Sequence, residues 1–340
     1  METMGIKFAP LNTPLNRRIE TLSAFFWFVT FAFGNFVCFW LAAYLIFFTS
    51  YWLYVLLYIG WAYYDRETPY KGGRKFTFLQ NLPFWKYFNN YFPINLEKTA
   101  DLTNDRNYLF CCHPHGILCA GMFGNFASGY SKFKSYYPGF NVYSATLDLH
   151  FRSPFFREYC LGLGAVSSAK ESIQYILDDK KKGNILALAV GGAAESFYAK
   201  PGSYRIVLKK RKGFIRIALE VGCSLVPVFS FGETDLYDQV PNPPGSLLNK
   251  MQNFMKDLIG FAPILPKGRG LLQYSFGIVP MRTPLTTVVG KPIELPKTAE
   301  PSDEIVQKYH AMYTEALIKL FNEHKTKYLK NAENISLVIE

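Results

Sequence analysis

A long uncharged segment near the N-terminus constrains the fold of this chain more than any other feature does. From Thr21 to Tyr64 the sequence contains no Asp, Glu, Lys, Arg or His over 44 residues. As one straight helix this segment is about 66 Å long, roughly twice the hydrocarbon core of a bilayer. We therefore expect two helices of about 20 residues that meet near residues 42–50 and form a transmembrane or re-entrant membrane hairpin.

Basic residues flank this hairpin on both sides. They are Lys7, Arg17 and Arg18 before it, and Arg66, Lys71, Arg74 and Lys75 after it. Because basic flanks favour the cytosolic side, we expect residues 1–20 to be a cytosolic segment and both ends of the hairpin (residues 21–64) to face the cytosol. Two alternatives fit less well: a buried helix pair of a soluble protein keeps a polar face, and a signal peptide has a shorter apolar region.

Residues 65–100 form an aromatic-rich segment after the hairpin. The stretch FTFLQNLPFWKYFNNYFPINL (76–96) mixes aromatic residues with amides and one lysine. This composition is typical of a segment at a membrane interface, and also of a short helix packed on a globular domain. Both interpretations stay open at this point.

The composition narrows the classes of partner. The 340 residues are 49% hydrophobic, which is ample for a buried core, and the formal net charge is +11, which indicates an anionic partner. The aromatic content of 17% favours a membrane surface over nucleic acid, and no nucleic-acid partner is expected. Six cysteines are too few and too scattered for a disulfide framework, so we expect reduced thiols in the cytosol.

Residues 101–340 read as a cytosol-facing α/β domain. Short apolar runs alternate with amphipathic helices, as in a sheet buried on both faces. The predicted strands are Tyr108–Cys112, Asn141–Ala145, Ile185–Val190, Ser224–Val228 and Thr286–Val289, and two predicted helices are Gly213–Val221 and Asp303–Tyr328. Pro227 inside the fourth strand predicts an edge strand or a β-bulge.

The stretch LFCCHPHGILCAG (109–121) is the first candidate for chemistry. A zinc site is one interpretation, but Cys111 and Cys112 are adjacent on a predicted strand and point to opposite faces, and no second ligand pair follows at a suitable spacing. We expect no metal. A His-Pro-His-Gly turn at a strand end instead presents His113 or His115 rigidly at the sheet edge where ligands bind, as a general base requires.

Two further clusters suit the same chemistry. VGGAAE (190–195) ends a predicted buried strand with two glycines beside the acid Glu195. The run LKKRKGFIR (208–216) gathers cations where a helix begins, as a phosphate-binding segment does, although it also fits a plain solvated face. Its cations are Lys209, Lys210, Arg211, Lys212 and Arg216.

The order of motifs along the whole chain resembles the type-2 diacylglycerol acyltransferases, which include monoacylglycerol and wax-alcohol acyltransferases. The matching motifs are YFP (91–93), HPHG (113–116), VGGAAE (190–195), RKGFIRIALEVGCSLVPVFSFGE (211–233), QYSFG (273–277) and TTVVGKPIE (286–294). The resemblance implies a glycerolipid-acyltransferase-like α/β domain that is anchored in the endoplasmic-reticulum membrane and also locates to lipid droplets. It implies transfer of a fatty acyl group from acyl-CoA to an acylglycerol or alcohol.

The resemblance also implies roles for particular residues. His113 and His115 fall on the family's essential HPHG, with His113 preferred as the base, and Glu195 matches the family's acid. Related glycerolipid acyltransferases place an Asp five residues after the histidine, whereas this chain has Leu118 there. Glu195 is therefore our candidate for the group that orients His113.

The expected mechanism is direct transfer by a histidine base. Backbone N–H groups at Gly116, Gly191 or Gly192 would hold the oxyanion, the cations of residues 209–216 would bind the phosphates of CoA, and the acyl tail would enter along the apolar segment. No cofactor is expected besides the substrate acyl-CoA. We prefer diacylglycerol as acceptor, with monoacylglycerol or a long-chain alcohol as alternatives, and homo-oligomerisation stays open.

Three rival interpretations account for fewer of these motifs. A serine lipase needs a GxSxG elbow, and the nearest strings, VFSFG (228–232) and QYSFG (273–277), lack the first glycine. An acyl-cysteine intermediate on Cys111 or Cys112 is the second, and direct transfer predicts that replacing both by serine leaves most activity. A lipid-droplet coat or membrane-anchored lipid-binding protein explains the apolar segment and the charge, but it gives no reason for HPHG or VGGAAE.

Overall fold

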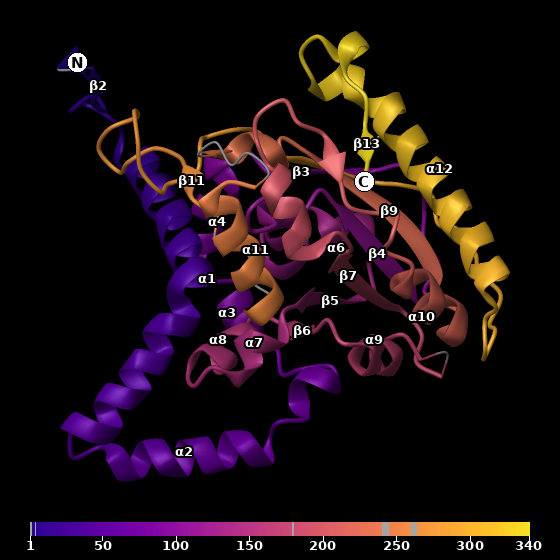
Figure 1. The fold of residues 1–340 in the computed structure, drawn as a ribbon, viewed down its shortest axis with the longest axis horizontal. Coiled ribbons are helices and arrows are strands. Elements are labelled where there is room, and N and C mark those ends of the chain that lie inside the picture. The colour runs from indigo at the N-terminus through magenta and orange to yellow at the C-terminus, as the bar shows by residue number, and fades with distance from the viewer. Residues whose placement is uncertain (1, 4, 179, 240–244, 260–263) are drawn as a thin grey trace.

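A mixed β-sheet lies at the centre of the molecule (Figure 1). The computed structural model describes residues 2–3, 5–178, 180–239, 245–259 and 264–340. Within these residues the central sheet has seven strands, in the order β3 (Asn95–Lys98), β12 (Thr286–Val289), β9 (Ser224–Phe231), β4 (Tyr108–His113), β7 (Asn184–Ala189), β5 (Asn141–Thr146) and β6 (Ala165–Ser167). Strand β12 pairs antiparallel with β9 and parallel with β3, while β9, β4, β7, β5 and β6 all run parallel.

Helices and short strand pairs surround this sheet. The α-helices are α1 (Leu15–Phe48), α2 (Trp52–Tyr64), α3 (Thr77–Gln80), α4 (Pro83–Tyr91), α5 (Ala120–Met122), α6 (Phe133–Tyr136), α7 (Asp148–Arg152), α8 (Phe156–Gly162), α9 (Lys170–Ile176), α10 (Gly213–Val221), α11 (Leu247–Ile259) and α12 (Asp303–Tyr328). Shorter helical turns are η1 (Thr68–Tyr70), η2 (Phe123–Ala127), η3 (Gly192–Tyr198), η4 (Glu233–Leu236) and η5 (Ala332–Asn334). Three small strand pairs are β1 (Glu2–Thr3) with β2 (Ile6–Lys7), β8 (Arg205–Ile206) with β13 (Val338–Ile339), and β10 (Asp238–Gln239) with β11 (Pro266–Lys267).

The α/β prediction for the globular part is confirmed. All five predicted strands occur in the central sheet, and the two predicted helices coincide with α10 and α12. Strands β3 and β6 were not predicted. The sequence NLEK of β3 is mostly polar and β6 has only three residues, so neither gives an apolar run or an alternation long enough to detect.

Both faces of the central strand β4 are buried, and its side chains alternate between two cores. Leu109 and Cys111 pack in one cluster with residues of α10 and α12. Phe110 and Cys112 pack in another, against Phe126 and other aromatic residues. The predicted placement of the two adjacent cysteines on opposite faces is therefore confirmed.

Pro227 lies in an interior strand, so the prediction of an edge strand was wrong. Strand β9 is paired on both sides, by β4 and by β12. The register of β9 with the chain after β12 shifts by one residue between the Val289–Val228 pair and the Leu225–Ile293 bridge. A proline without an N–H is tolerated at this shift because a bulge leaves one backbone position out of the ladder.

The uncharged segment forms two helices of unequal length rather than two of about 20 residues. Helix α1 has 34 residues and α2 has 13, and they meet at Thr49–Tyr51. The turn forms there because the hydroxyl of Thr49 donates to the Leu45 carbonyl and accepts from the N–H of Tyr51. Among the described helices, α1 alone is long and apolar enough to cross a bilayer.

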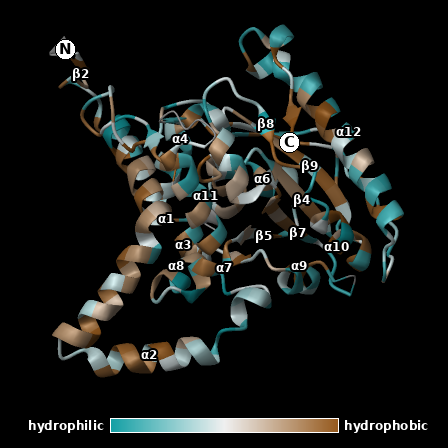
Figure 2. Cartoon of the chain, in the orientation of Figure 1, coloured by the Kyte–Doolittle hydropathy of each residue, from teal (hydrophilic) through white to brown (hydrophobic). Residues whose placement is uncertain are grey.

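The two halves of α1 have different surroundings (Figure 1). The first half packs on the globular part through Ala24, Trp27 and Phe28, which are all buried. The second half projects away from the body and leads into α2, and both are coloured mainly as hydrophobic in Figure 2. Their apolar side chains lie in the open, as in Trp40, Phe47 and Phe48, each about three-quarters exposed.

The aromatic segment of residues 76–96 packs on the globular part through α4. Trp85, Phe88 and Tyr91 are fully buried, and the Trp85 indole N–H donates to the Leu79 carbonyl. Phe88 lies 5.0 Å from Trp27 of α1, centroid to centroid. Helix α4 therefore packs on the globular part, whereas Phe76 and Phe78 earlier in the same stretch are exposed. Strand β3 extends the sheet back to residue 95, inside the aromatic-rich segment of residues 65–100.

Candidate functional site

The predicted site residues gather at the carboxyl edge of three adjacent parallel strands. Strand β4 ends at His113, and its neighbours β7 and β9 lead into η3 and η4. Glu195 lies in η3, and Glu233 begins η4. This is the edge at which open α/β sheets bind ligands.

His113 is completely buried, and both of its ring nitrogens face protein groups. Nδ1 lies 3.3 Å from Glu195 Oε1, and Nε2 lies 3.1 Å from the hydroxyl of Tyr313 on α12. Nδ1–H can donate to the carboxylate, and the Tyr313 hydroxyl can donate its one proton to Nε2 or to the Cys111 carbonyl, which lies 3.3 Å away. In this arrangement His113 is held as part of a buried network and does not line the cavity described below.

Glu195 connects His113 to the HPHG turn. Its Oε2 accepts the backbone N–H of His115 at 2.7 Å, and its Oε1 accepts the N–H of Val207 at 2.9 Å. The carboxylate is 1% exposed, and its side chain folds back over Gly191, where a Cβ atom would lie 1.9 Å from the carboxyl carbon. Only glycine fits at position 191 for this reason. Glu195 therefore fixes the backbone that presents His115.

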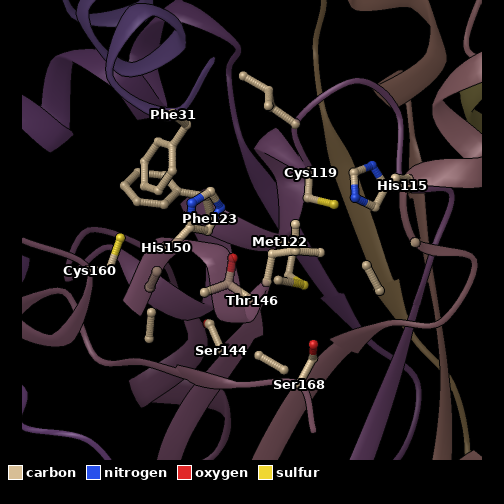
Figure 3. Close-up of a pocket in the computed structure, with 18 of the residues that line it drawn as sticks. Phe31, His115, Cys119, Met122, Phe123, Ser144, Thr146, His150, Cys160 and Ser168 are labelled. Carbon is tan, nitrogen blue, oxygen red and sulfur yellow. The ribbon is translucent and has the colours of Figure 1, made fainter. Parts of the chain in front are cut away.

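Of the two histidines in HPHG, His115 is the one that faces the cavity (Figure 3). Its Nδ1 lies 3.2 Å from the Gly116 carbonyl and 3.1 Å from the Ser196 hydroxyl. A carbonyl can only accept, so Nδ1 carries the proton and Nε2 is the basic nitrogen. Burial lowers the pKa of His115 below its usual value, although the charge of Glu195 opposes this effect. The ring is consequently neutral at pH 7, as a general base must be.

The cavity beside His115 is mainly apolar and is closed on one side by α1. It has a volume of about 230 Å³. Trp27, Phe31 and Phe36 of α1 form one wall, and Met122 and Phe123 form another. The buried half of α1 thus lines a cavity for an apolar molecule, while its exposed half continues as the projecting arm.

The predicted glycines lie around this turn. Gly192 lines the cavity, and the Gly191 carbonyl accepts a hydrogen bond from Arg211 Nη2 at 3.2 Å. Gly116 has φ of +60°, and a Cβ atom there would lie 2.7 Å from Glu233 Cγ. A side chain at position 116 would be strained and would displace Glu233.

Glu233 is part of the site that the sequence analysis missed. It is buried, and it accepts the backbone N–H groups of Ala120 and Gly121 at 2.8 and 2.7 Å. Burial raises the pKa of Glu233 to about 7, against the lowering effect of these two donors. Its position offered a signal, because it follows a strand and a glycine at the same sheet edge as Glu195 does. Tyr313 gave no comparable signal. It is one of the apolar residues that recur at helical spacing along Asp303–Tyr328, and such a pattern predicts ordinary core packing.

One residue of the basic run, Arg211, contacts the site. Arg211 contacts Gly191, next to the cavity-lining Gly192, while Lys209, Lys210 and Lys212 are exposed beside it. Arg216 lies further along α10 and pairs with Asp303 of α12 at 2.5 Å. Residues 209–212 therefore lie near the cavity, whereas Arg216 is held by its ion pair with Asp303.

The cysteines of the HPHG region are buried thiols. Burial raises the pKa of both Cys111 and Cys112, and neither lines the cavity. Cys119 does line it, and burial raises its pKa as well. None of the three is poised as a thiolate nucleophile. In the part of the chain that the structure describes, no group of three or more His, Cys, Asp or Glu side chains is arranged to hold a metal ion.

Fold and site together define an α/β protein that presents a neutral histidine to an apolar cavity, with a buried carboxylate behind it. A family model described as "Diacylglycerol acyltransferase" matches residues 44–340. The chain belongs to the diacylglycerol acyltransferase family, and it is an acyltransferase of neutral-lipid synthesis. This confirms the resemblance inferred from the motifs.

Three curated relatives show the same relationship. The chain is 46% identical to a 2-acylglycerol O-acyltransferase 1 of Bos taurus over 96% of its own length and 97% of the relative's. It is 45% identical to an acyl-CoA wax alcohol acyltransferase 2 of Mus musculus, over 84% and 86% of the two chains. It is 43% identical to a diacylglycerol O-acyltransferase 2 of Dictyostelium discoideum, over 94% and 96%.

Proposed function

We propose that this enzyme transfers a fatty acyl group from acyl-CoA to the hydroxyl of a neutral lipid, an acylglycerol or a long-chain alcohol. The relatives are named for 2-acylglycerol, wax alcohol and diacylglycerol as acceptors. A hydroxyl-bearing lipid is the substrate class common to all three names. The acyl group comes from acyl-CoA, which the name of the wax alcohol relative specifies.

The observation that carries this proposal is the position of His115. Its Nδ1 is occupied by the Gly116 carbonyl, so its basic Nε2 is available at the wall of an apolar cavity. We propose His115 as the base, in place of the His113 preferred from the sequence, because His113 is enclosed by Glu195 and Tyr313. His113 would then act as a positioning residue within the buried network.

The proposed reaction is a direct transfer. His115 Nε2 takes the proton of the acceptor hydroxyl as its oxygen attacks the thioester carbonyl carbon. A C–O bond forms, the C–S bond breaks, and the imidazolium returns the proton to the CoA thiolate. Backbone N–H groups of Gly116, Gly191 or Gly192 would stabilise the oxyanion of the tetrahedral intermediate. No cofactor takes part in this scheme.

Two further parts of the chain fit the substrates. Lys209, Lys210, Arg211 and Lys212 would bind the phosphates of CoA, and the contact of Arg211 with Gly191 brings this charge close to the reacting centre. The acyl chain would lie in the cavity against α1. Its route from the bilayer would follow the exposed half of that helix.

Product analysis tests this function. Purified full-length protein in vesicles receives labelled oleoyl-CoA with monooleoylglycerol, dioleoylglycerol or hexadecanol, and the products are separated by thin-layer chromatography. We expect a labelled ester with at least one acceptor and release of free CoA. Binding of the lipids without any ester formation would instead indicate a lipid-binding or droplet-coat protein.

We also propose that the exposed apolar arm, residues 37–64, enters one leaflet of the endoplasmic-reticulum membrane and of the lipid-droplet surface, with the globular part in the cytosol. The exposed half of α1 and the whole of α2 have about 13 residues each, or about 20 Å, which is shorter than the roughly 30 Å hydrocarbon core. The basic flanks support the cytosolic side for both ends. A re-entrant hairpin fits these lengths better than two spans do.

Cysteine labelling in sealed microsomes checks the insertion. Thr49→Cys, at the turn between the helices, is expected to gain no label from a membrane-impermeant maleimide on either side, measured against the parent chain. Glu323→Cys, on the exposed side of α12, serves as the control and should label from the cytosolic side. Labelling of position 49 from the lumen alone would show that both helices cross the membrane.

A further inference from the structure

A second polar cluster lies in the cavity, away from His115 (Figure 3). His150 of α7, Asn35 of α1 and Ser144 of β5 all line the same cavity. Figure 3 shows His115 beside Cys119 at one end and His150 beside Phe31 at the other, with Met122 between them. The proposed transfer chemistry uses none of the three polar residues.

This cluster contains hydrogen-bonding atoms that lack protein partners. The Asn35 amide donates to His150 Nδ1 at 2.7 Å, but Asn35 Oδ1 has no partner. The Ser144 hydroxyl also has none. Asn35 and Ser144 are 8% and 7% exposed, so both are buried polar groups on the wall of a mainly apolar cavity. Buried polar atoms are nearly always satisfied, and those that are not call for a ligand or an ordered water.

The protonation of His150 defines what this cluster offers. Burial lowers the pKa of His150 to about 4, so the ring is neutral at pH 7. Because Nδ1 accepts from the Asn35 amide, the proton lies on Nε2, which is a donor. The cluster thus presents an acceptor on Asn35, a donor on His150, and a hydroxyl on Ser144 that can do both. A hydroxyl or ester oxygen matches this set.

We infer that Asn35, His150 and Ser144 form an acceptor-lipid subsite that binds an oxygen other than the reacting hydroxyl. This inference rests on the proposed function. The acyl chain of a simple acyl-CoA carries no oxygen beyond the thioester, and a long-chain alcohol has only the oxygen that reacts at His115. An acylglycerol carries further oxygens, as a second hydroxyl or as ester groups. The subsite therefore selects acylglycerols over long-chain alcohols as acceptors.

Near-isosteric apolar substitutions test the subsite. Asn35→Leu and His150→Phe remove the polar groups and keep most of the volume. We expect kcat/KM for monooleoylglycerol or dioleoylglycerol to fall roughly tenfold relative to kcat/KM for hexadecanol, the loss expected for one hydrogen bond. The KM for oleoyl-CoA should stay the same. A larger loss with monooleoylglycerol indicates a bound hydroxyl, and one with dioleoylglycerol indicates a bound ester.

Matched variants separate this role from a structural one. Asn35 and His150 also join α1 to α7, so a merely structural role would lower the rates with all acceptors together. Phe39→Leu changes an exposed apolar residue of the same helix that does not line the cavity, and it should leave the acceptor ratio at the wild-type value. His150→Asn keeps a polar side chain and should restore much of the acylglycerol preference. Melting temperatures show which variants fold.

Two results would overturn the inference while leaving the proposed function intact. One is an unchanged acceptor ratio in folded Asn35→Leu and His150→Phe, which would mean that the cluster holds only water or supports the fold. The other is a wild-type enzyme that acylates hexadecanol better than either acylglycerol. A wild-type protein that forms no ester with any acceptor would instead refute the proposed function itself.

Discussion

His115→Asn is expected to lower kcat/KM for ester formation by about 10²- to 10⁴-fold, the usual contribution of a general base. The half-buried ring contacts only Gly116 and Ser196 through hydrogen bonds given by the structure, so the folded state should persist. Labelled oleoyl-CoA with the preferred acceptor measures the rate, and thermal unfolding in detergent checks the fold. As the pH is lowered, kcat/KM of the wild-type enzyme should begin to fall only below pH 6.5. Burial lowers the pKa of His115, and protonation of its ring removes the base.

The same substitution at His113 is the comparison that decides between the two histidines. Asparagine at position 113 can still donate to Glu195, so His113→Asn should retain more activity than His115→Asn does. His324→Ala, on α12 near the surface, is the control and should leave the rate unchanged. If His113→Asn proves the more damaging variant while its melting temperature matches the wild type, the base is His113.

Glu195→Ala is expected to destabilise the protein by about 3–5 kcal/mol and to abolish most activity. The substitution leaves the N–H groups of His115 and Val207 and the Nδ1 of His113 without their partner in a buried site. It also empties the space over Gly191 that the carboxylate fills. Thermal or denaturant unfolding measures the stability, and the ester assay measures the activity.

Glu195→Gln separates the two effects. Its amide oxygen can replace only one of the two carboxylate oxygens, and the NH2 group that replaces the other cannot accept a hydrogen bond. Because its volume is nearly unchanged, this variant should recover part of the stability but little of the activity. Glu97→Gln is a matched control, since Glu97 pairs with Lys327 at the far edge of the sheet. It should cost about 1 kcal/mol or less, as a partly exposed pair does. A Glu195→Ala variant with wild-type stability and rate would remove Glu195 from the site.

The sheet and the placement of the site could largely be predicted from the sequence. Buried parallel strands read as continuous apolar runs, and this identified β4, β7 and β9 together with the residues that follow them. The common edge of these strands then brought HPHG and VGGAAE together, because neighbouring parallel strands end at the same side. The helical spacing of its apolar residues and the capping residue Ser302 predict helix α12. In the structure the Ser302 hydroxyl accepts a hydrogen bond from the N–H of Ile305.

The orientation of individual side chains could not be predicted in the same way. His113 is the last residue of a strand and His115 lies in a turn, so strand alternation does not decide which ring faces the cavity. The partners of His113 and His150 come from residues 313 and 35, which are 200 and 115 positions away in the sequence. No local pattern links such residues. The turn between α1 and α2 lies at Thr49–Tyr51, inside a long uncharged segment whose sequence does not show where the first helix ends.

Helix α1 is continuous from the wall of the cavity to the arm that we place in the bilayer, and this has a practical consequence for making a soluble form of the enzyme. Removing residues 1–64 to discard the arm would also remove Trp27, Phe31 and Phe36, which form one wall of the cavity. The remaining fragment would be open to water where a fatty chain should lie. The proposed membrane arm and one wall of the cavity belong to the same helix, so removing the arm together with this helix would damage the cavity.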